Sequence, residues 1–230
     1  MNDSKPNVLR RIRSFVRREG RLTPGQQNAI DTGWPLFGLD SKTLIQPDQL
    51  FANNNPVILE IGFGNGESLA TMAQNNPEQN FIGIEVHHPG VGHLLRLIQE
   101  RKINNIRLFD SDAIDILQHC IADNSLDGLQ LFFPDPWHKK RHHKRRIVQS
   151  NFLDLIHRKL KTGGTFHAAT DWENYAEHII ETLNNHPGFS CSNKETFRLR
   201  PEHRPITKFE QRGQRLGHGV WDIIYNKVDL

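Results

Sequence analysis

The chain has 230 residues, a formal net charge of +3 and a pI near 9.0. This length fits one large domain that buries a core without covalent staples. Its two cysteines, Cys120 and Cys191, are too few for a disulfide framework and favour a reducing cytoplasm. The chain lacks an apolar run that could span a bilayer or serve as a signal peptide, so we expect no membrane association and no export.

Basic residues gather in three clusters, at residues 5–21, 138–146 and 194–215. Any one cluster on its own could be a solvated charged face. Three clusters around an acidic middle favour a polyanion partner such as RNA. The acids Asp3, Glu19 and Asp31 and the scarcity of serine argue against a transit peptide at the N-terminus.

From residue 57 onward, short apolar runs alternate with amphipathic stretches, which is typical of an α/β fold with a mostly parallel sheet. The predicted strands are Val57–Ile61, Phe81–Glu85, Ile106–Asp110, Gly128–Phe133 and Thr165–Thr170, followed by two antiparallel strands at one sheet edge, Glu195–Leu199 and Gly219–Asn226. The predicted helices are Gly66–Gln74, Val91–Lys102, Ala113–Cys120, Ile147–Leu160 and Glu173–Asn184. We expect Gly163 and Gly164 to end the fourth helix and Asp171 to cap the fifth.

Residues 1–56 contain five prolines and little periodicity. They predict a basic N-terminal arm and a loosely structured lead-in, partly flexible, which orders on binding. Residues 57–230 form the predicted α/β domain.

The first predicted strand runs into a turn that contains Gly62, Gly64 and Gly66. Glycine at alternate positions allows a sharp reversal and lets a ligand approach bare backbone. A dinucleotide fingerprint would need a further glycine at position 67, which is Glu67 here. The pattern therefore disfavours a nicotinamide oxidoreductase.

Three acids follow successive strands and strengthen this distinction. Glu60 precedes the turn, where a carboxylate repels a pyrophosphate but favours the sulfonium and ammonium of S-adenosylmethionine. Glu85 ends the second strand, where an acid can accept hydrogen bonds from ribose hydroxyls. Asp112, followed by Ala113, comes after the third strand and is expected at the adenine edge. We therefore predict an S-adenosylmethionine site.

Asp135 lies between Pro134 and Pro136 at the end of the fourth strand, which predicts a rigid, extended loop at the mouth of the same crevice. A turn packed against Trp137 is the alternative. The segment PDPWHKKRHHKRR, residues 134–146, closely resembles the tRNA (guanine-N7-)-methyltransferase family. Further segments that resemble this family, in order, are RSFVRREGRLTPGQ (13–26), LEIGFGNGESL (59–69), GIEVH (83–87), TDWENYAE (170–177) and TKFEQRGQRLGHGVWD (207–222).

The resemblance implies a Rossmann-like, doubly wound, seven-stranded class I methyltransferase sheet that methylates N7 of a guanine in the tRNA variable loop, guanine 46. It implies cofactor contacts at Glu60, Glu85, Asp112 and Asp135, with Asp135 also catalytic. The implied substrate contacts are Lys139, Asp171, Thr207, Lys208, Phe209 and Glu210. The implied RNA contacts are Lys140, Arg141, His142, His143, Lys144, Arg145 and Arg146, and protonation of the two histidines would make RNA affinity depend on pH.

Two other functions stay open from the residues alone. The acceptor could be another RNA base or a protein side chain, or the chain could be an RNA-binding module without activity. His87, His88 and His93, or His138, His142 and His143, could be imagined as metal ligands, but the neighbouring Pro89 and Gly90, or the like charges, argue against a metal. We expect a monomer, and the sequence leaves a homodimer open.

Overall fold

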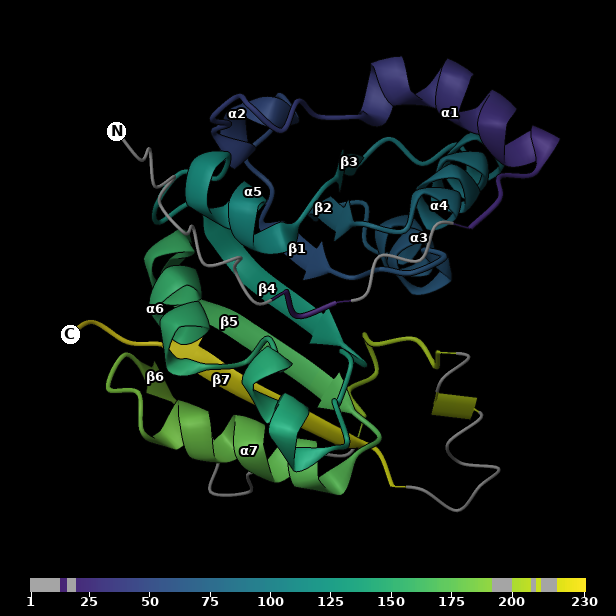
Figure 1. Ribbon diagram of the computed structural model, residues 1–230. Coiled ribbons are helices and arrows are strands. Elements are labelled where there is room, and N and C mark those ends of the chain that lie inside the picture. Colours follow the sequence, from purple (N-terminus) through teal and green to yellow (C-terminus); the bar gives the residue numbers. More distant parts are fainter. Residues whose placement is uncertain (1–12, 16–19, 192–199, 208–209, 212–218) are drawn as a thin grey trace, which may run out of the picture.

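The structure is a computed structural model that describes residues 13–15, 20–191, 200–207, 210–211 and 219–230. The described strands form a seven-stranded sheet in the order β3-β2-β1-β4-β5-β7-β6 (Figure 1). Their bounds are β1 Val57–Ile61, β2 Asn80–Glu85, β3 Ile106–Asp110, β4 Leu126–Phe132, β5 Leu160–Thr170, β6 Phe189–Ser190 and β7 Trp221–Lys227.

The first five strands are parallel, whereas β7 pairs antiparallel with both β5 and β6. This confirms the predicted fold class. The predicted strand at Gly219–Asn226 is found as β7, and Glu195–Leu199 lies outside the described residues. The short edge strand β6 was not predicted.

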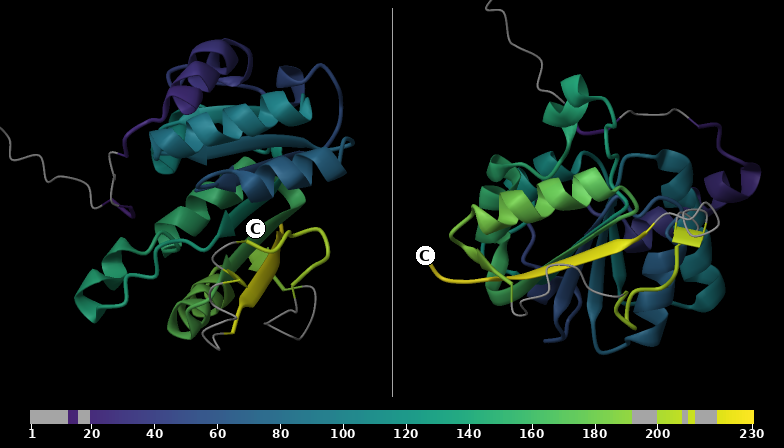
Figure 2. Two further views of the ribbon diagram at one scale, coloured as in Figure 1. Left: turned by 90° about the vertical axis from the view of Figure 1, so that its right-hand side faces the viewer. Right: turned by 90° about the horizontal axis from the view of Figure 1, so that it is seen from below.

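Helices cover both faces of the sheet (Figure 1 and Figure 2). One apolar core packs β-strand side chains against α5, α6 and α7, and a second packs the opposite face against α1, α3 and α4. The α-helices are α1 Pro24–Phe37, α2 Pro47–Leu50, α3 Glu67–Asn75, α4 His88–Arg101, α5 Ala113–His119, α6 Ser150–Lys159 and α7 Glu173–Asn184, and a 3-10 helix, η1, spans Lys140–Arg145. Among the described residues, no helix is both long and apolar enough to cross a membrane.

The strand order places the functional crevice. The chain adds β2 and β3 on one side of β1 and then returns to place β4 on the other side. The connections that leave β1 and β4 therefore diverge at their carboxyl ends, and this is where open α/β sheets bind ligands.

Helix α1 shows that the predicted loose lead-in is wrong for residues 24–37. Thr23 caps this helix: its Oγ1 accepts the Gln26 amide (3.3 Å), while Gln26 Oε1 accepts the Thr23 amide (2.9 Å). Pro24 occupies the first turn, where its missing N–H costs no hydrogen bond. The Gln26 side chain also donates to the carbonyl of Pro89 (3.0 Å) and so links α1 to α4.

Two predicted helix caps are wrong, although the predicted end of α6 and start of α7 agree with the structure to within one residue. Helix α6 ends at Lys159, because Leu160 adopts an extended conformation and pairs with Leu126 of β4. Gly163, at φ +80°, therefore lies inside β5, near an irregularity in its pairing with β4, and does not cap the helix. Asp171 does not cap α7 either, since Trp172 is the N-cap residue and no side chain caps that helix.

Candidate functional site

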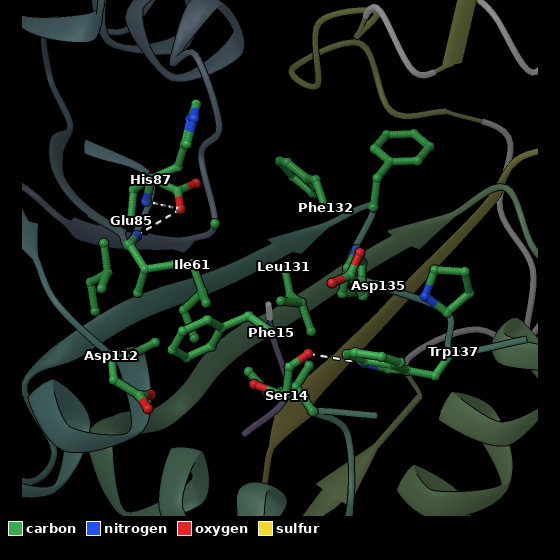
Figure 3. Close-up of a pocket in the computed structure, with 18 of the residues that line it drawn as sticks. Ser14, Phe15, Ile61, Glu85, His87, Asp112, Leu131, Phe132, Asp135 and Trp137 are labelled. Atoms are coloured by element: carbon green, nitrogen blue, oxygen red, sulfur yellow. Dashed lines mark hydrogen bonds between the residues drawn. The ribbon is translucent and has the colours of Figure 1, made fainter. Parts of the chain in front are cut away.

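A cavity of about 800 Å³ opens at the carboxyl ends of β1, β2 and β4 and beside the start of α5. Figure 3 shows Glu85 and Asp112 on one side of it and Asp135 and Trp137 on the other. Of the predicted site residues, those that line it are Gly62, Glu85, Asp112, Ala113, Asp135, Lys139 and His142. The connections that follow four different strands thus meet at one cavity.

The glycine turn needs its glycines for two different reasons. Gly62, Gly64 and Gly66 all have positive φ, at 74°, 58° and 75°. A β-carbon at Gly66 would lie within 2.7 Å of Leu94, so this glycine permits packing against α4. A β-carbon at Gly62 or Gly64 would meet no atom within 4 Å, so the backbone there faces open space that a ligand can approach.

Gly90, in the first turn of α4, packs against the glycine turn, a contact that was not predicted. A β-carbon on Gly90 would lie 2.1 Å from the carbonyl oxygen of Gly64. The first turn of α4 thus presses against the glycine turn, and only glycine fits there. Its place after His88 and Pro89 offered no sequence signal for this contact.

The Glu85 carboxylate is held by three backbone amides. Oε2 accepts from Gly64 (2.7 Å), and Oε1 accepts from Val86 (2.6 Å) and His87 (2.9 Å). Glu85 therefore organises the glycine turn as well as lining the cavity, a role that its predicted contact with ribose did not include.

Glu60 is buried below the turn, at 3% exposure, and its Oε2 atom has no hydrogen-bond partner. Burial, with a smaller contribution from the charge of Glu85, raises the pKa of Glu60 to about 8. A buried, unpartnered carboxyl is costly unless a cation or a donor reaches it. The residues present therefore fit a cofactor that carries positive charge.

Asp112 occupies the N-cap position of α5, where its Oδ1 accepts the amide of Ile114 (3.0 Å). Both Asp112 and Ala113 line the cavity, and Asp112 lies on the side opposite Asp135 (Figure 3). Capping fixes the orientation of the Asp112 carboxylate before any ligand binds.

Asp135 is exposed and lies on the cavity wall that β4 continues. The predicted extended conformation is wrong at both ends of this loop, because Phe133 (φ 51°) and Trp137 (φ 48°) are left-handed. Such values are rare for aromatic residues and persist only where surrounding contacts hold them. The Phe133 amide donates to Ala169 of β5 (2.7 Å), which anchors the first of these bends.

Residues 13–15 complete the cavity, which sequence reasoning missed. Ser14 and Phe15 line it. The Trp137 indole N–H donates to the Ser14 carbonyl (2.9 Å), and Arg145 Nε donates to the Arg13 carbonyl (3.2 Å). The guanidinium of Arg145 also lies 3.8 Å from the centre of the Trp137 ring. These two side chains of the loop after β4 thus bind the N-terminal arm together.

Most of the predicted RNA contacts lie on η1 and its flanks. Lys139, Lys140, Arg141 and Lys144 are exposed, and His142, His143 and Arg145 are partly buried. Desolvation and the charges of Arg141 and Arg145 lower the pKa of His142, so its protonation moves to lower pH than expected.

Arg146 does not share this surface. Its side chain is buried, donates to Pro136 O (3.0 Å) and Asn174 Oδ1 (2.9 Å), and lies 4.8 Å from the Tyr175 ring centre. The structure thus places it inside the fold, where it braces the loop that carries Asp135.

Among the described residues, the other predicted substrate residues Asp171, Thr207 and Glu210 do not line the cavity. Asp171 follows β5 and is partly buried, and Lys208 and Phe209 lie outside the described residues. Thr207 Oγ1 accepts the Glu210 amide (3.1 Å), and the Glu210 side chain is buried against Arg204 (2.7 Å). Among the described residues, no group of three or more His, Cys, Asp or Glu side chains could hold a metal ion.

Comparisons with known proteins agree with this geometry. A family model described as "Putative methyltransferase" matches residues 54–223. A tRNA (guanine-N(7)-)-methyltransferase of Vibrio cholerae serotype O1 is 59% identical over 96% of this chain and 94% of its own length. The protein of the same name from Pseudoalteromonas atlantica is 55% identical over 96% of this chain and 93% of its own length.

Solved structures share the fold at low sequence identity. The 16S rRNA methyltransferase KamB superposes with a TM-score of 0.58 at 13% identity and covers 80% of this chain and 92% of its own. A 16S rRNA (adenine(1408)-N(1))-methyltransferase from Catenulisporales acidiphilia gives a TM-score of 0.56 at 15% identity, covering 83% and 96%. The nearly full-length relatives, together with the family model, show that the chain belongs to the tRNA (guanine-N(7)-)-methyltransferase family.

Proposed function

We propose that this protein transfers a methyl group from S-adenosylmethionine to N7 of a guanine in the variable loop of tRNA. The observation that carries the proposal is the composition of a single cavity. One end is formed by Gly62 and Glu85, with the buried Glu60 and its unpartnered Oε2 behind the lining, and the other by Asp135 and Lys139 at the start of a basic loop. The resemblance to the family makes guanine 46 the expected acceptor.

The cofactor end contains groups suited to each part of S-adenosylmethionine. Glu60 would balance the positive charge, Glu85 would accept hydrogen bonds from the ribose hydroxyls, and Asp112 with Ala113 would meet the adenine. When bound, the cofactor supplies an electrophilic methyl group on a sulfonium. The protein contributes the orientation of the acceptor and the exclusion of competing nucleophiles.

The acceptor end needs no general base, because guanine N7 has a lone pair and no proton to lose. Asp135 can accept hydrogen bonds from the guanine edge and stabilise the positive charge that develops on the purine. Lys139, on the same wall, can hold the adjoining phosphate. Alignment of the reacting atoms can contribute several kcal/mol, roughly 7 at the low end for well-oriented reactions.

The basic loop supports a nucleic acid as the substrate. Lys140, Arg141 and Lys144 are exposed on η1, and Arg145 connects this loop to the arm. These side chains can contact phosphates on both sides of a base that enters the cavity. Because such contacts follow backbone charge, they position the RNA without reading its sequence.

The test is methyl transfer to an unmodified tRNA transcript from a cofactor labelled on its methyl group, followed by chemical cleavage at 7-methylguanosine. A matched transcript with 7-deazaguanosine in place of guanosine lacks the acceptor atom and should take up no label. Cleavage at the variable-loop guanine is the expected result. Transfer of label to the 7-deaza transcript would identify another acceptor in the RNA and contradict the proposal. Label that remains in macromolecular material after ribonuclease treatment would identify a protein acceptor and also contradict it.

The role of Asp135 can be tested in the same assay. Asp135→Asn keeps the shape of the side chain and removes its charge. We expect kcat to fall by about a hundredfold to a thousandfold, the range for loss of an electrostatic contact to a transition state. Full turnover with normal RNA binding would exclude this role.

A further inference from the structure

A fully buried arginine lies behind the wall of the cavity that leads to Asp135. The exposure of Arg204 is 0%, and its Nε and Nη2 donate to the two carboxylate oxygens of Asp222, each at 2.7 Å. Its Nη1 donates to Glu210 Oε2, also at 2.7 Å. Bidentate pairing of this kind fixes both partners in direction as well as in distance.

The charges around Arg204 balance. Asp222 and Glu210 are both buried, and Arg200 Nε lies 3.7 Å from the second oxygen of Glu210. His167 Nε2 lies 2.7 Å from Asp222 Oδ1, and burial lowers the pKa of His167, which keeps its ring neutral. Two guanidinium groups thus face two carboxylates, so the cluster can stay buried.

The cluster joins two segments near the C-terminal end of the chain. Asp222 belongs to β7, where it pairs with Ala169 of β5. Thr207 Oγ1 accepts the Glu210 amide (3.1 Å), and the Gln211 amide donates to the Thr207 carbonyl (3.0 Å). Arg204 therefore ties Glu210, and with it Thr207, to the start of β7.

The same guanidinium also supports the Asp135 wall. It lies 5.8 Å from the ring centre of Phe132 and 5.6 Å from that of Phe133. Both rings line the cavity, and Phe133 carries the left-handed bend that precedes Pro134 and Asp135. Figure 3 shows Phe132 and Asp135 on the same wall, opposite Glu85 and Asp112.

We propose that Arg204 is a positioning residue for the methyl acceptor. Through Asp222 it holds Glu210, and with it Thr207, against β7, and through Phe133 it fixes the bend that presents Asp135. Glu210 therefore influences the reaction through Arg204. The inference rests on the proposed function, because it assigns Arg204 to the acceptor end of that site and leaves the cofactor end, built on β1, β2 and α5, outside its influence.

The test compares Arg204→Lys with the unsubstituted enzyme. Lysine keeps the charge but cannot bind two carboxylates in the same fork. We expect kcat for methylation of tRNA to fall about tenfold to a hundredfold, as a misplacement on the order of 1 Å would cause. The Kd for S-adenosylmethionine and the KM for tRNA should change by less than about threefold. Glu210→Gln, which keeps a hydrogen-bond acceptor, should lower kcat less than Glu210→Ala does.

Lys159→Met is the matched control. Lys159 is also a buried cation, paired with Asp123 at 2.6 Å, but it lies at the other end of β5. It should lower the melting temperature without changing kcat in the folded protein. If Lys159→Met and Arg204→Lys reduce kcat equally, or if cofactor affinity falls in parallel with kcat, the positioning role is wrong.

Amide hydrogen exchange gives a readout that does not depend on activity. Arg204→Lys should speed exchange in peptides that contain the Phe133 and Glu210 amides and leave those of the glycine turn unchanged. Should Arg204→Lys fail to fold, Asp222→Asn disrupts the same bidentate ion pair, and amide exchange in the same peptides can be measured in that variant. If the unsubstituted enzyme makes no 7-methylguanosine, the proposed function fails, whereas unchanged exchange at Phe133 and Glu210 overturns the positioning role alone.

Discussion

Cofactor binding should be linked to the ionisation of Glu60. Its raised pKa of about 8 means that the free protein holds this carboxyl protonated near neutral pH. A bound cation stabilises the ionised form, so binding near neutral pH should release a proton. Substitution by Gln removes this titration while keeping the shape of the side chain.

The magnitude follows from the pKa. At about pH 6 a group with a pKa of about 8 is almost fully protonated, and ionising it costs about 3 kcal/mol. At about pH 8.5 that cost is nearly gone. We compare the ratio of the Kd of the unsubstituted protein to the Kd of Glu60→Gln at these two pH values. This ratio should be about a hundredfold larger at about pH 6 than at about pH 8.5.

Calorimetry measures both quantities. Titrations with S-adenosylmethionine in buffers of different ionisation enthalpy give the Kd and the number of protons released. The amino group of the cofactor titrates in the same range, near pH 8. Since parent and variant share that contribution, their ratio isolates Glu60. Equal proton release and equal pH dependence in the two proteins would refute the reasoning.

Stability provides an independent check with a defined sign. The folded pKa of Glu60 lies above its ordinary value of 4.5, so the folded protein binds more protons than the unfolded one between these values. The free protein should therefore lose stability relative to Glu60→Gln as the pH rises from about 5 to 8, by roughly 3 to 4 kcal/mol. Thermal unfolding of both proteins without cofactor would measure this.

Three further predictions concern the RNA surface, the glycine turn and α1. Replacing Lys140, Arg141, Lys144 and Arg145 with Ala should make the plot of log affinity for tRNA against log salt concentration less steep, by about 0.7 to 0.9 for each phosphate that the protein no longer neutralises. The control replaces the exposed Lys42 and Arg158 together. An unchanged slope in the fourfold variant would mean that the RNA binds elsewhere on the protein. Gly90→Ala should weaken cofactor binding at least about tenfold, because its β-carbon would meet the Gly64 carbonyl at 2.1 Å, whereas Gly25→Ala, with no atom within 4 Å, should leave affinity unchanged. Thr23→Ala removes a capping box and should cost about 1 kcal/mol in denaturant unfolding at unchanged cofactor affinity, and an unaltered midpoint would contradict the cap.

The central strands and the glycine turn could be predicted because their signals are local. Burial on both faces of a parallel sheet produces apolar runs, and the predicted bounds of β1 and β3 coincide with those observed. Helix α1 was missed although Thr23, Pro24 and Gln26 carry a helix-start signal, because prolines on either side suggested a loop.

Features that depend on distant partners could not be predicted from the residues nearby. Arg146 belongs to an unbroken basic run, and only its contacts with Asn174 and Tyr175 turn it inward. Glu210 could be recognised as a site residue by resemblance, but its engagement by Arg204 follows from packing that no spacing reveals. A sequence motif shows that a charged residue is present, but only the tertiary structure determines whether that residue is buried.

The way in which the arm is attached has a practical consequence for anyone who trims or tags this protein. Trp137 and Arg145 hold the arm by the main-chain carbonyls of Ser14 and Arg13, so most substitutions at these two positions would preserve the contacts. Truncation to a start at residue 16 would instead remove both acceptors together with the Phe15 wall of the cavity. Such a shortened protein could keep its fold and its melting temperature and still bind the cofactor poorly, a defect that alanine scanning of the arm would overlook.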